Sequence, residues 1–136
     1  MLAVVDTGPL YAVLDRSDGD HQRCLEVLER EELRLVIPAL VVAEVAYLAG
    51  TRLGAKVESR FVAGLEEFDV IAPGAADWPR IAELVRRYES FPLGAVDASV
   101  LALAEKLKAN VIVTLDRRHF AAVRPRHTRS LTLLPD

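Results

Sequence analysis

Residues 97–116 read DASVLALAEKLKANVIVTLD, and this stretch decides the fold. The mostly apolar segment from Asp97 to Ala109 predicts a helix that packs against the rest of the protein. Val111 to Leu115 is an uninterrupted apolar run rich in β-branched residues, which is typical of a strand buried on both faces. Strands of this kind occur in parallel sheets covered by helices, so we expect an α/β protein.

The remainder of the chain repeats this alternation of strands and helices. Further strands are expected at 2–5, 35–37, 68–72 and 131–134, and helices at 9–14, 21–32, 39–49, 53–67 and 77–88. No hairpin signal separates the strands, which favours a parallel sheet with helices on both faces. We predict one domain over residues 1–136, because this length and 51% hydrophobic content suffice for a single core.

Composition limits the class of protein and its compartment. Cys24 is the single cysteine, so no internal disulfide can form, and we expect a buried, unreactive thiol in a reducing environment. The apolar runs are too short for a signal peptide or a bilayer span, which predicts a soluble, cytoplasmic protein. The net charge of −3 gives no overall nucleic-acid signal, but seven cations face one acid between Lys106 and Arg129.

Three aspartates lie where the predicted elements meet. Asp6 ends the first strand, Asp116 ends the strand after residue 110, and Asp97 opens the helix before it. Helix capping alone could explain each of them. However, the carboxyl ends of parallel strands share one edge, where ligands bind in α/β proteins. Asp6 and Asp116 are therefore expected at one crevice, with Asp97 beside them if its helix starts at that edge.

Glu44 is harder to explain by structure alone. It is the only charged residue in 35–49, LVIPALVVAEVAYLA, and on a helix it aligns with Leu40 and Leu48. We therefore expect its carboxylate to emerge, buried, from the apolar face. Burial of an unpaired carboxylate costs several kcal/mol or forces protonation. No lysine or arginine lies within this stretch to form an ion pair.

Four carboxylates in one pocket would repel one another unless a divalent cation neutralised them. Oxygen ligands suit Mg²⁺ or Mn²⁺ better than zinc. The three histidines, His21, His119 and His127, lack the spacing of zinc ligands and are expected at the surface. Carboxylate-held Mg²⁺ pairs commonly serve displacement at phosphorus. Arg117 and Arg118 follow Asp116 directly, so we predict that they bind RNA phosphates at the rim.

These residues resemble a known family, the PIN-domain ribonucleases, and in particular the VapC-type toxins of prokaryotic toxin–antitoxin pairs. The resemblance rests on VVDTGPLYAVLD near the start, VVAEVAYL around Glu44, and DASVLALAEKLKANVIVTLDRRHF near the end. It implies a three-layer α/β/α sandwich, homodimerisation, dependence on Mg²⁺ or Mn²⁺, and cleavage of RNA. An antitoxin would be a separate chain.

The resemblance also implies roles for individual residues. Asp6, Glu44, Asp97 and Asp116 would form the catalytic, metal-binding acidic site, in which Glu44 would reach the metal through water. Hydroxyl groups at Thr7 and Thr114 would support these acids.

Other classes of protein remain open at this point. Asp6-Thr7-Gly8 also matches the active-site triplet of aspartic proteases, although these need an all-β fold that the helical spacings disfavour. Phosphoryl-transfer enzymes with an aspartyl nucleophile usually carry a second acid two residues later, where this chain has Gly8. An RNA-processing nuclease outside any toxin–antitoxin system, or a non-catalytic binding module, would also fit much of the pattern.

Overall fold

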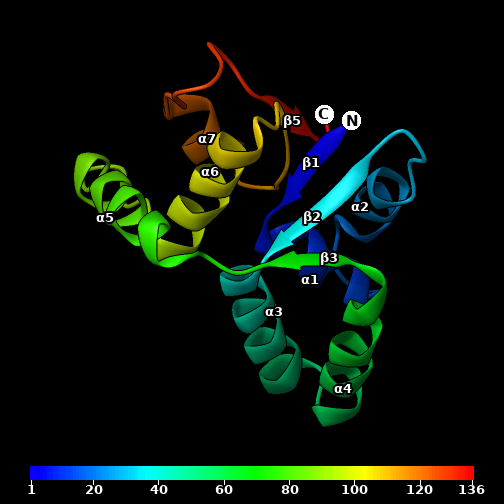
Figure 1. Cartoon of the computed structure of the whole chain (residues 1–136). Helices are drawn as coiled ribbons and strands as arrows, with labels where there is room; N and C mark the ends of the chain where they lie inside the picture. Colours follow the sequence, from blue (N-terminus) through cyan, green and yellow to red (C-terminus); the bar gives the residue numbers. More distant parts are fainter.

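The computed structural model describes residues 1–136 and is built around one parallel sheet (Figure 1). In the sheet, Ala3 pairs with Leu35 on one side and with Val111 on the other. The strand order is β3-β2-β1-β4-β5, and all four pairings are parallel, as predicted. The strands are β1 (Leu2–Val5), β2 (Arg34–Pro38), β3 (Asp69–Ile71), β4 (Val111–Val113) and β5 (Thr132–Leu134).

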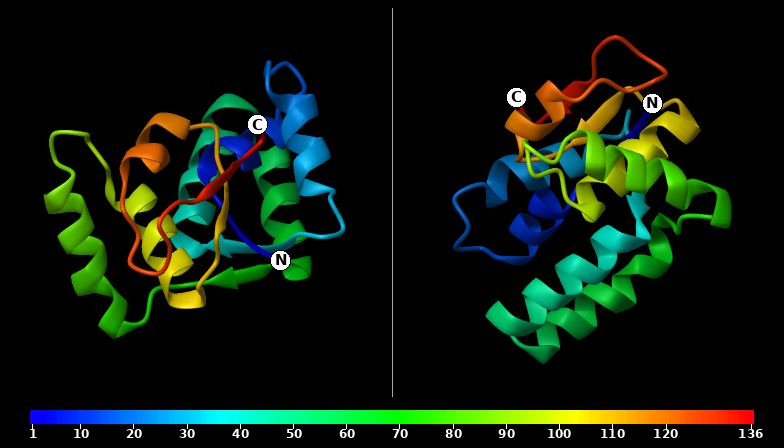
Figure 2. Two further views of the ribbon diagram at one scale, coloured as in Figure 1. Left: turned by 90° about the horizontal axis from the view of Figure 1, so that it is seen from above. Right: turned by 90° about the vertical axis from the view of Figure 1, so that its left-hand side faces the viewer.

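Helices cover both faces of this sheet, which confirms the predicted three-layer α/β/α sandwich. Figures 1 and 2 show α1 and α2 on one side of the sheet, and α6 and α7 on the other. Helix α5 packs on α6, while α3 and α4 pair with each other and project beyond the carboxyl edge of the strands. The helices are α1 (Thr7–Leu14), α2 (His21–Leu28), α3 (Ala39–Arg52), α4 (Ala55–Gly64), α5 (Trp78–Arg87), α6 (Ala95–Leu107) and α7 (Arg117–Ala122).

The central strands are buried on both faces, as their composition predicts. Val4, Val5, Ile112 and Val113 have no exposed surface and belong to a core cluster of 26 buried residues. Cys24 is also fully buried, and this burial raises the pKa of its thiol to about 11. The thiol is therefore neutral near pH 7 and acts as a packing group, as expected.

No helix combines the length and the apolar character needed to cross a lipid bilayer.

Some predicted boundaries were wrong, each for a local reason. Helix α3 does not end at Gly50 but continues to Arg52, and within the helix Gly50 lets the Glu58 side chain of α4 come close. A Cβ at Gly50 would collide with that carboxylate. The chain turns instead at Gly54, whose positive φ of 97° suits glycine. Helix α2 stops at Leu28, because the charged residues that follow have no apolar partner.

The order of the strands creates a crevice at one place along the sheet. From β1 the chain moves outward to β2 and β3, and then returns to the other side of β1 to form β4 and β5. Adjacent parallel strands whose connections leave in opposite directions leave a gap beyond their carboxyl ends, where α/β proteins bind ligands. In this protein the gap lies beyond β1 and β4, next to the first turn of α6.

Candidate active site

A cleft of about 640 Å³ opens at this crevice and brings the four predicted acids together. Asp6 follows β1, Asp116 lies beyond β4, Asp97 belongs to the first turn of α6, and Glu44 lies on α3. The cleft is lined by Asp6, Thr7, Gly8, Glu44, Gly94, Ala95, Val96, Asp97, Leu115 and Asp116. The condition for Asp97 is met, because α6 starts at the carboxyl edge of the sheet.

Asp6 is the most buried of the four acids, with only 4% of its surface exposed. Its backbone N–H donates to the carbonyl of Val113, so the sheet itself fixes its position. Although Asp6 precedes α1, its side chain does not cap that helix. Instead, Oδ2 accepts a hydrogen bond of 2.8 Å from the Thr114 hydroxyl, while Oδ1 is buried without any partner. Capping therefore does not explain Asp6.

The environment of Asp6 makes its ionisation costly. Burial, followed by repulsion from Asp97, raises its pKa from 3.8 to about 7. The hydrogen bond from Thr114 and the nearby backbone of Thr7 partly oppose this rise in pKa, and Asp116 adds further repulsion. A carboxyl group whose pKa is raised to near neutral pH in a cleft is typical of functional sites. An incoming positive charge stabilises the ionised form of such a group.

Thr114 connects two of the acids. Its fully buried hydroxyl donates to Asp6 and accepts a hydrogen bond of 2.9 Å from the backbone N–H of Asp116. One side chain therefore fixes both the Asp6 carboxylate and the start of the loop that carries Asp116. The second predicted hydroxyl, that of Thr7, lines the cleft and is buried without a partner.

Thr114→Val is expected to lower the free energy of unfolding by about 1–3 kcal/mol, because it leaves Oδ2 of Asp6 and the Asp116 N–H without their shared partner. The pKa of Asp6 should also rise further, since a hydrogen bond that lowers it is lost. Urea unfolding measures the first effect. Thr114→Ser is the matched control and should stay close to wild type; equal losses in both variants would point to packing rather than hydrogen bonding.

Asp97 lies on the side of the cleft formed by α6. Gly94 caps this helix, so Asp97 occupies its third position and does not act as the cap. Burial raises the pKa of Asp97, and repulsion from Asp116 and Glu44 adds to the rise, while His119 opposes it. Three acidic groups therefore influence one another electrostatically across the cleft.

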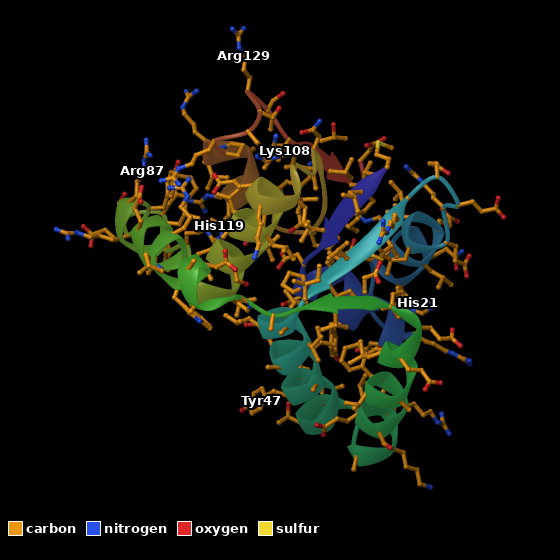
Figure 3. The ribbon with its side chains drawn as sticks, in the orientation of Figure 1. His21, Tyr47, Arg87, Lys108, His119 and Arg129 are labelled. Atoms are coloured by element: carbon orange, nitrogen blue, oxygen red, sulfur yellow. The ribbon has the colours of Figure 1, made fainter.

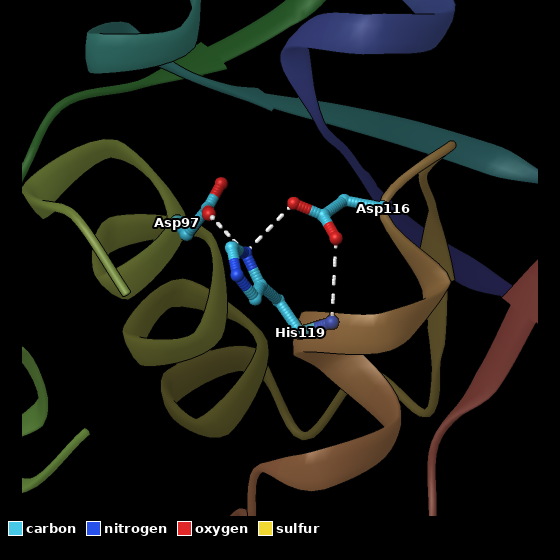
Figure 4. Close-up of side chains that lie close together, drawn as sticks. All are labelled: Asp97, Asp116 and His119. Carbon is cyan, nitrogen blue, oxygen red and sulfur yellow. Dashed lines mark hydrogen bonds and ion pairs between the residues drawn. The ribbon is translucent and has the colours of Figure 1, made fainter. Parts of the chain in front are cut away.

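Asp116 does cap a helix, and in doing so it positions a histidine that was not predicted for the site. Oδ1 of Asp116 accepts a hydrogen bond of 3.3 Å from the backbone N–H of His119, three residues later in α7. The imidazole of His119 then reaches back toward the carboxylates (Figure 4). Its Nδ1 lies 2.7 Å from Oδ2 of Asp116 and 3.4 Å from Oδ2 of Asp97.

The expectation that His119 is a surface residue was therefore wrong. Its side chain is only 20% exposed, and its ring packs edge-on against Phe91 with the ring centroids 5.7 Å apart. Figure 3 shows His119 near α6, whereas Arg129 projects from the tip of the loop before β5. The useful signal in the sequence was the D-x-x-H spacing, which places a histidine over its own helix cap.

Glu44 lines the cleft, but it is not buried as expected. Val41, Val45 and Ala49 form the buried stripe of α3, and Glu44 lies beside this stripe on the exposed side. Helix α3 projects beyond the sheet, so less of its circumference is covered than its apolar sequence suggests. Glu44 therefore stands at the mouth of the cleft, where water can reach it.

The two arginines after Asp116 have different surroundings. The Arg117 guanidinium donates hydrogen bonds of 3.0 and 2.9 Å to the carbonyls of Leu133 and Pro135, which ties α7 to the end of the chain. Arg118 is exposed and lies over the ring of Phe91, 5.6 Å from its centroid. Phe91 also contacts His119, so Arg118 is the one beside the cleft. RNA binding by either arginine stays a prediction.

The donors of the cleft fit a divalent cation. Asp6 offers a buried carboxylate oxygen without a hydrogen-bond partner, and Asp97, Asp116 and His119 place three donor atoms within 4.8 Å of one another. A lone buried carboxylate oxygen is rare unless a cation or water completes it. Raised pKa values at Asp6 and Asp97 point the same way, because a bound cation would remove the repulsion that causes part of the rise.

Comparison with known proteins shows relatives over nearly the whole chain. The PIN domain family profile matches residues 3–124. Ribonuclease VapC26 of Mycobacterium tuberculosis is 34% identical over 134 residues, which cover 97% of this chain and 99% of that protein.

Solved structures share the fold at lower identity. Mycobacterium tuberculosis VapC20, described as a toxin that cleaves the sarcin–ricin loop, superposes with a TM-score of 0.80 at 18% identity, covering 93% of this chain and 98% of its own. VapBC2 of Rickettsia felis, crystallised with a DNA fragment of its promoter, gives a TM-score of 0.69 at 20% identity, covering 98% of this chain and 97% of its own.

Proposed function

The chain belongs to the PIN-domain family, and from this premise we propose that it is a metal-dependent endoribonuclease that acts as the toxin of a toxin–antitoxin pair. The observation that carries the proposal is the cleft at the β1–β4 crevice, where four acids from distant parts of the chain converge around the unpartnered Oδ1 of Asp6. The identity of 34% to a protein named as a ribonuclease supports RNA as the substrate. The parallel α/β fold leaves no room for the aspartic-protease alternative, which needs an all-β fold.

In this proposal Asp6, Asp97 and Asp116 hold the cation, Mg²⁺ or Mn²⁺, and their fixed positions follow from β1, α6 and the Asp116 cap. When bound, the cation would polarise the phosphodiester and offset the negative charge that builds up during displacement. Glu44, exposed at the mouth of the cleft, orients the attacking water and accepts its proton. The water oxygen bonds to phosphorus as the bond to the 3′ oxygen breaks, and the 3′ oxygen takes a proton from solvent, leaving a 5′-phosphate and a 3′-hydroxyl.

The test is incubation of the purified protein with mixed RNA in the presence of Mg²⁺ or Mn²⁺, with and without a chelator. Cleavage that requires the cation and leaves a 5′-phosphate and a 3′-hydroxyl, which can be ligated directly, would support the proposal. Cleavage that persists in the chelator would contradict the metal dependence. The absence of cleavage with either ion, for a protein that binds RNA, would favour the binding-module alternative.

We expect Arg118→Ala to weaken RNA binding roughly three- to tenfold. The slope of the logarithm of the binding constant against the logarithm of salt concentration should also become shallower by about one, as for the loss of one phosphate contact. Arg118 is exposed beside the cleft and has no carboxylate partner. Fluorescence anisotropy over a series of salt concentrations measures both effects. Arg129→Ala removes an equally exposed arginine at the tip of a distant loop and should change neither. Equal effects in both variants would show that Arg118 contributes only to the overall positive charge and makes no specific phosphate contact.

The proposed partners are an antitoxin on a separate chain and a second copy of this protein. A neighbour in fold from Klebsiella pneumoniae is named as a toxin–antitoxin complex, which supports the antitoxin. Homodimerisation rests on the family resemblance, and light scattering of the purified chain measures it. Growth arrest on expression, relieved by the product of the adjacent reading frame, would distinguish a toxin from an RNA-processing nuclease outside such a system.

A further inference from the structure

We propose that His119 is a nitrogen ligand of the metal in this cleft, and that it makes the site prefer Mn²⁺ over Mg²⁺. The inference rests on the proposed metal-dependent function and goes beyond it, because it changes the donor set from oxygen alone to mixed oxygen and nitrogen. The donors in question are Nδ1 of His119, Oδ2 of Asp97 and Oδ2 of Asp116.

The spacing of these atoms is that of ligands sharing one ion. Nδ1 lies 2.7 Å from the Asp116 oxygen and 3.4 Å from the Asp97 oxygen (Figure 4). Neighbouring ligands of an octahedral ion with bonds of about 2.1 Å are about 3 Å apart, a value between these two separations. Nδ1 is also buried and makes no hydrogen bond of acceptable geometry. The nitrogen therefore faces two carboxylates without a regular partner of its own.

The local structure holds the imidazole in this place. The Asp116 cap fixes the backbone of His119, and Phe120, only 1% exposed, anchors the next position of α7 in the core. The Phe91 ring packs edge-on against the imidazole. A side chain supported at its backbone and along its ring loses little freedom when it binds an ion, so the arrangement suits a ligand.

The other two histidines show what a structural histidine looks like in this protein. Nδ1 of His21 lies 2.7 Å from the carbonyl of Ala12, and Nε2 of His127 lies 2.6 Å from the carbonyl of Ala109. Each ring therefore has a backbone carbonyl as its partner, and neither ring forms an ion pair with a carboxylate. His119 alone directs a ring nitrogen at carboxylates.

A second, independent feature indicates that the cluster receives an ion. Oδ1 of Asp6 is buried, unpartnered and part of the same cleft, and Asp6 as a whole is 4% exposed. Asp6 reaches the cleft from the end of β1, whereas His119 and Asp116 belong to α7 and its cap. An ion bound by both residues would give Oδ1 of Asp6 and Nδ1 of His119 the partner that each lacks.

The nitrogen changes which ion the cleft should prefer. Mg²⁺ takes oxygen ligands almost exclusively, imidazole suits the later first-row metals best, and Mn²⁺ is the first-row metal that also suits carboxylates. Mn²⁺ accepts carboxylate and imidazole ligands in the same octahedral shell. Replacing the imidazole with an amide oxygen should therefore weaken Mn²⁺ binding far more than Mg²⁺ binding.

The probe is Mn²⁺ bound to the wild-type chain. It reports on the ligands whether or not the chain cleaves RNA. Pulsed electron paramagnetic resonance should detect the ¹⁴N coupling of a directly bound imidazole. His119→Asn should abolish this coupling, weaken Mn²⁺ binding about tenfold or more, and change Mg²⁺ binding less than about threefold. His127→Gln, which keeps an amide nitrogen near the position of Nε2, is the matched control and should retain the coupling.

The outcomes separate this inference from the proposed function. Bound Mn²⁺ without ¹⁴N coupling in the wild type, or coupling that persists in His119→Asn, would overturn the nitrogen ligand and leave a metal-dependent nuclease intact. A wild-type chain that binds neither ion would overturn the metal-dependent function together with the ligand. Equal losses of Mn²⁺ and Mg²⁺ affinity in His119→Asn would overturn the selectivity.

Discussion

Asp97→Asn is expected to reduce RNA cleavage by more than about 100-fold, because it removes one of the three charges proposed to hold the ion, and even indirect supports of metal sites are worth 10- to 100-fold. The secondary structure should stay unchanged. The Asp97 side chain is partly exposed, and its pKa is raised by burial and by Asp116, so the neutral amide removes repulsion. A fluorogenic RNA substrate with Mg²⁺ or Mn²⁺ measures the cleavage, and far-ultraviolet circular dichroism measures the fold.

Asp69→Asn is the matched control for this experiment. Asp69 lies on the edge strand β3 and forms an exposed ion pair of 3.3 Å with Arg34, away from the cleft. Exposed pairs of this kind contribute little, so cleavage should stay within about twofold of wild type. Full cleavage by Asp97→Asn would remove Asp97 from the site, and full cleavage by Asp6→Asn as well would defeat the nuclease assignment.

The metal-free protein is expected to become more stable as the pH falls, by about 2 kcal/mol between about pH 8 and about pH 5.5 from Asp6 alone. The sign follows from the pKa of Asp6, which is about 7 in the folded protein and 3.8 as the ordinary value. In this interval the folded chain holds a proton that the unfolded chain has released. Stability is therefore gained below pH 7 and lost as the pH rises through 7.

Asp6→Asn isolates this effect, because it cannot ionise. Urea unfolding across the pH range, in the presence of a chelator, should give a flatter profile for Asp6→Asn than for wild type. The Asp69→Asn profile should run parallel to wild type. Added Mn²⁺ should stabilise the wild type most at high pH, since the carboxylates must be deprotonated to bind it. Parallel profiles for wild type and Asp6→Asn would show that Asp6 ionises normally.

The strand-end acids could be predicted because their surroundings are encoded locally. Apolar runs before Asp6 and Asp116 define buried strands, and parallel strands bring their ends to one edge. Only the sheet order could confirm that β1 and β4 are neighbours, since the two strands are formed by opposite ends of the chain. The sequence pattern thus indicated which residues meet at this edge and left their distances undetermined.

The errors came from features that local pattern does not carry. Helix α7 has six residues, too few for an apolar period, so His119 could not be placed from sequence. The exposure of Glu44 depends on how far α3 projects beyond the sheet, which is a tertiary property. Gly50 resembles a helix stop, but it serves the close approach of Glu58. In each case the packing of a second element decided the outcome.

The hydrogen bond between Asp6 and Thr114 joins residues 108 positions apart. Synthesis runs from the N-terminus, so β1 leaves the ribosome long before β4 exists to pair with it. A nascent chain therefore carries Asp6, Glu44 and Asp97 before Asp116 and His119 exist, and the full donor set assembles only after β4 emerges. The cleft therefore cannot form on the nascent chain until β4 and the loop that carries Asp116 have left the ribosome.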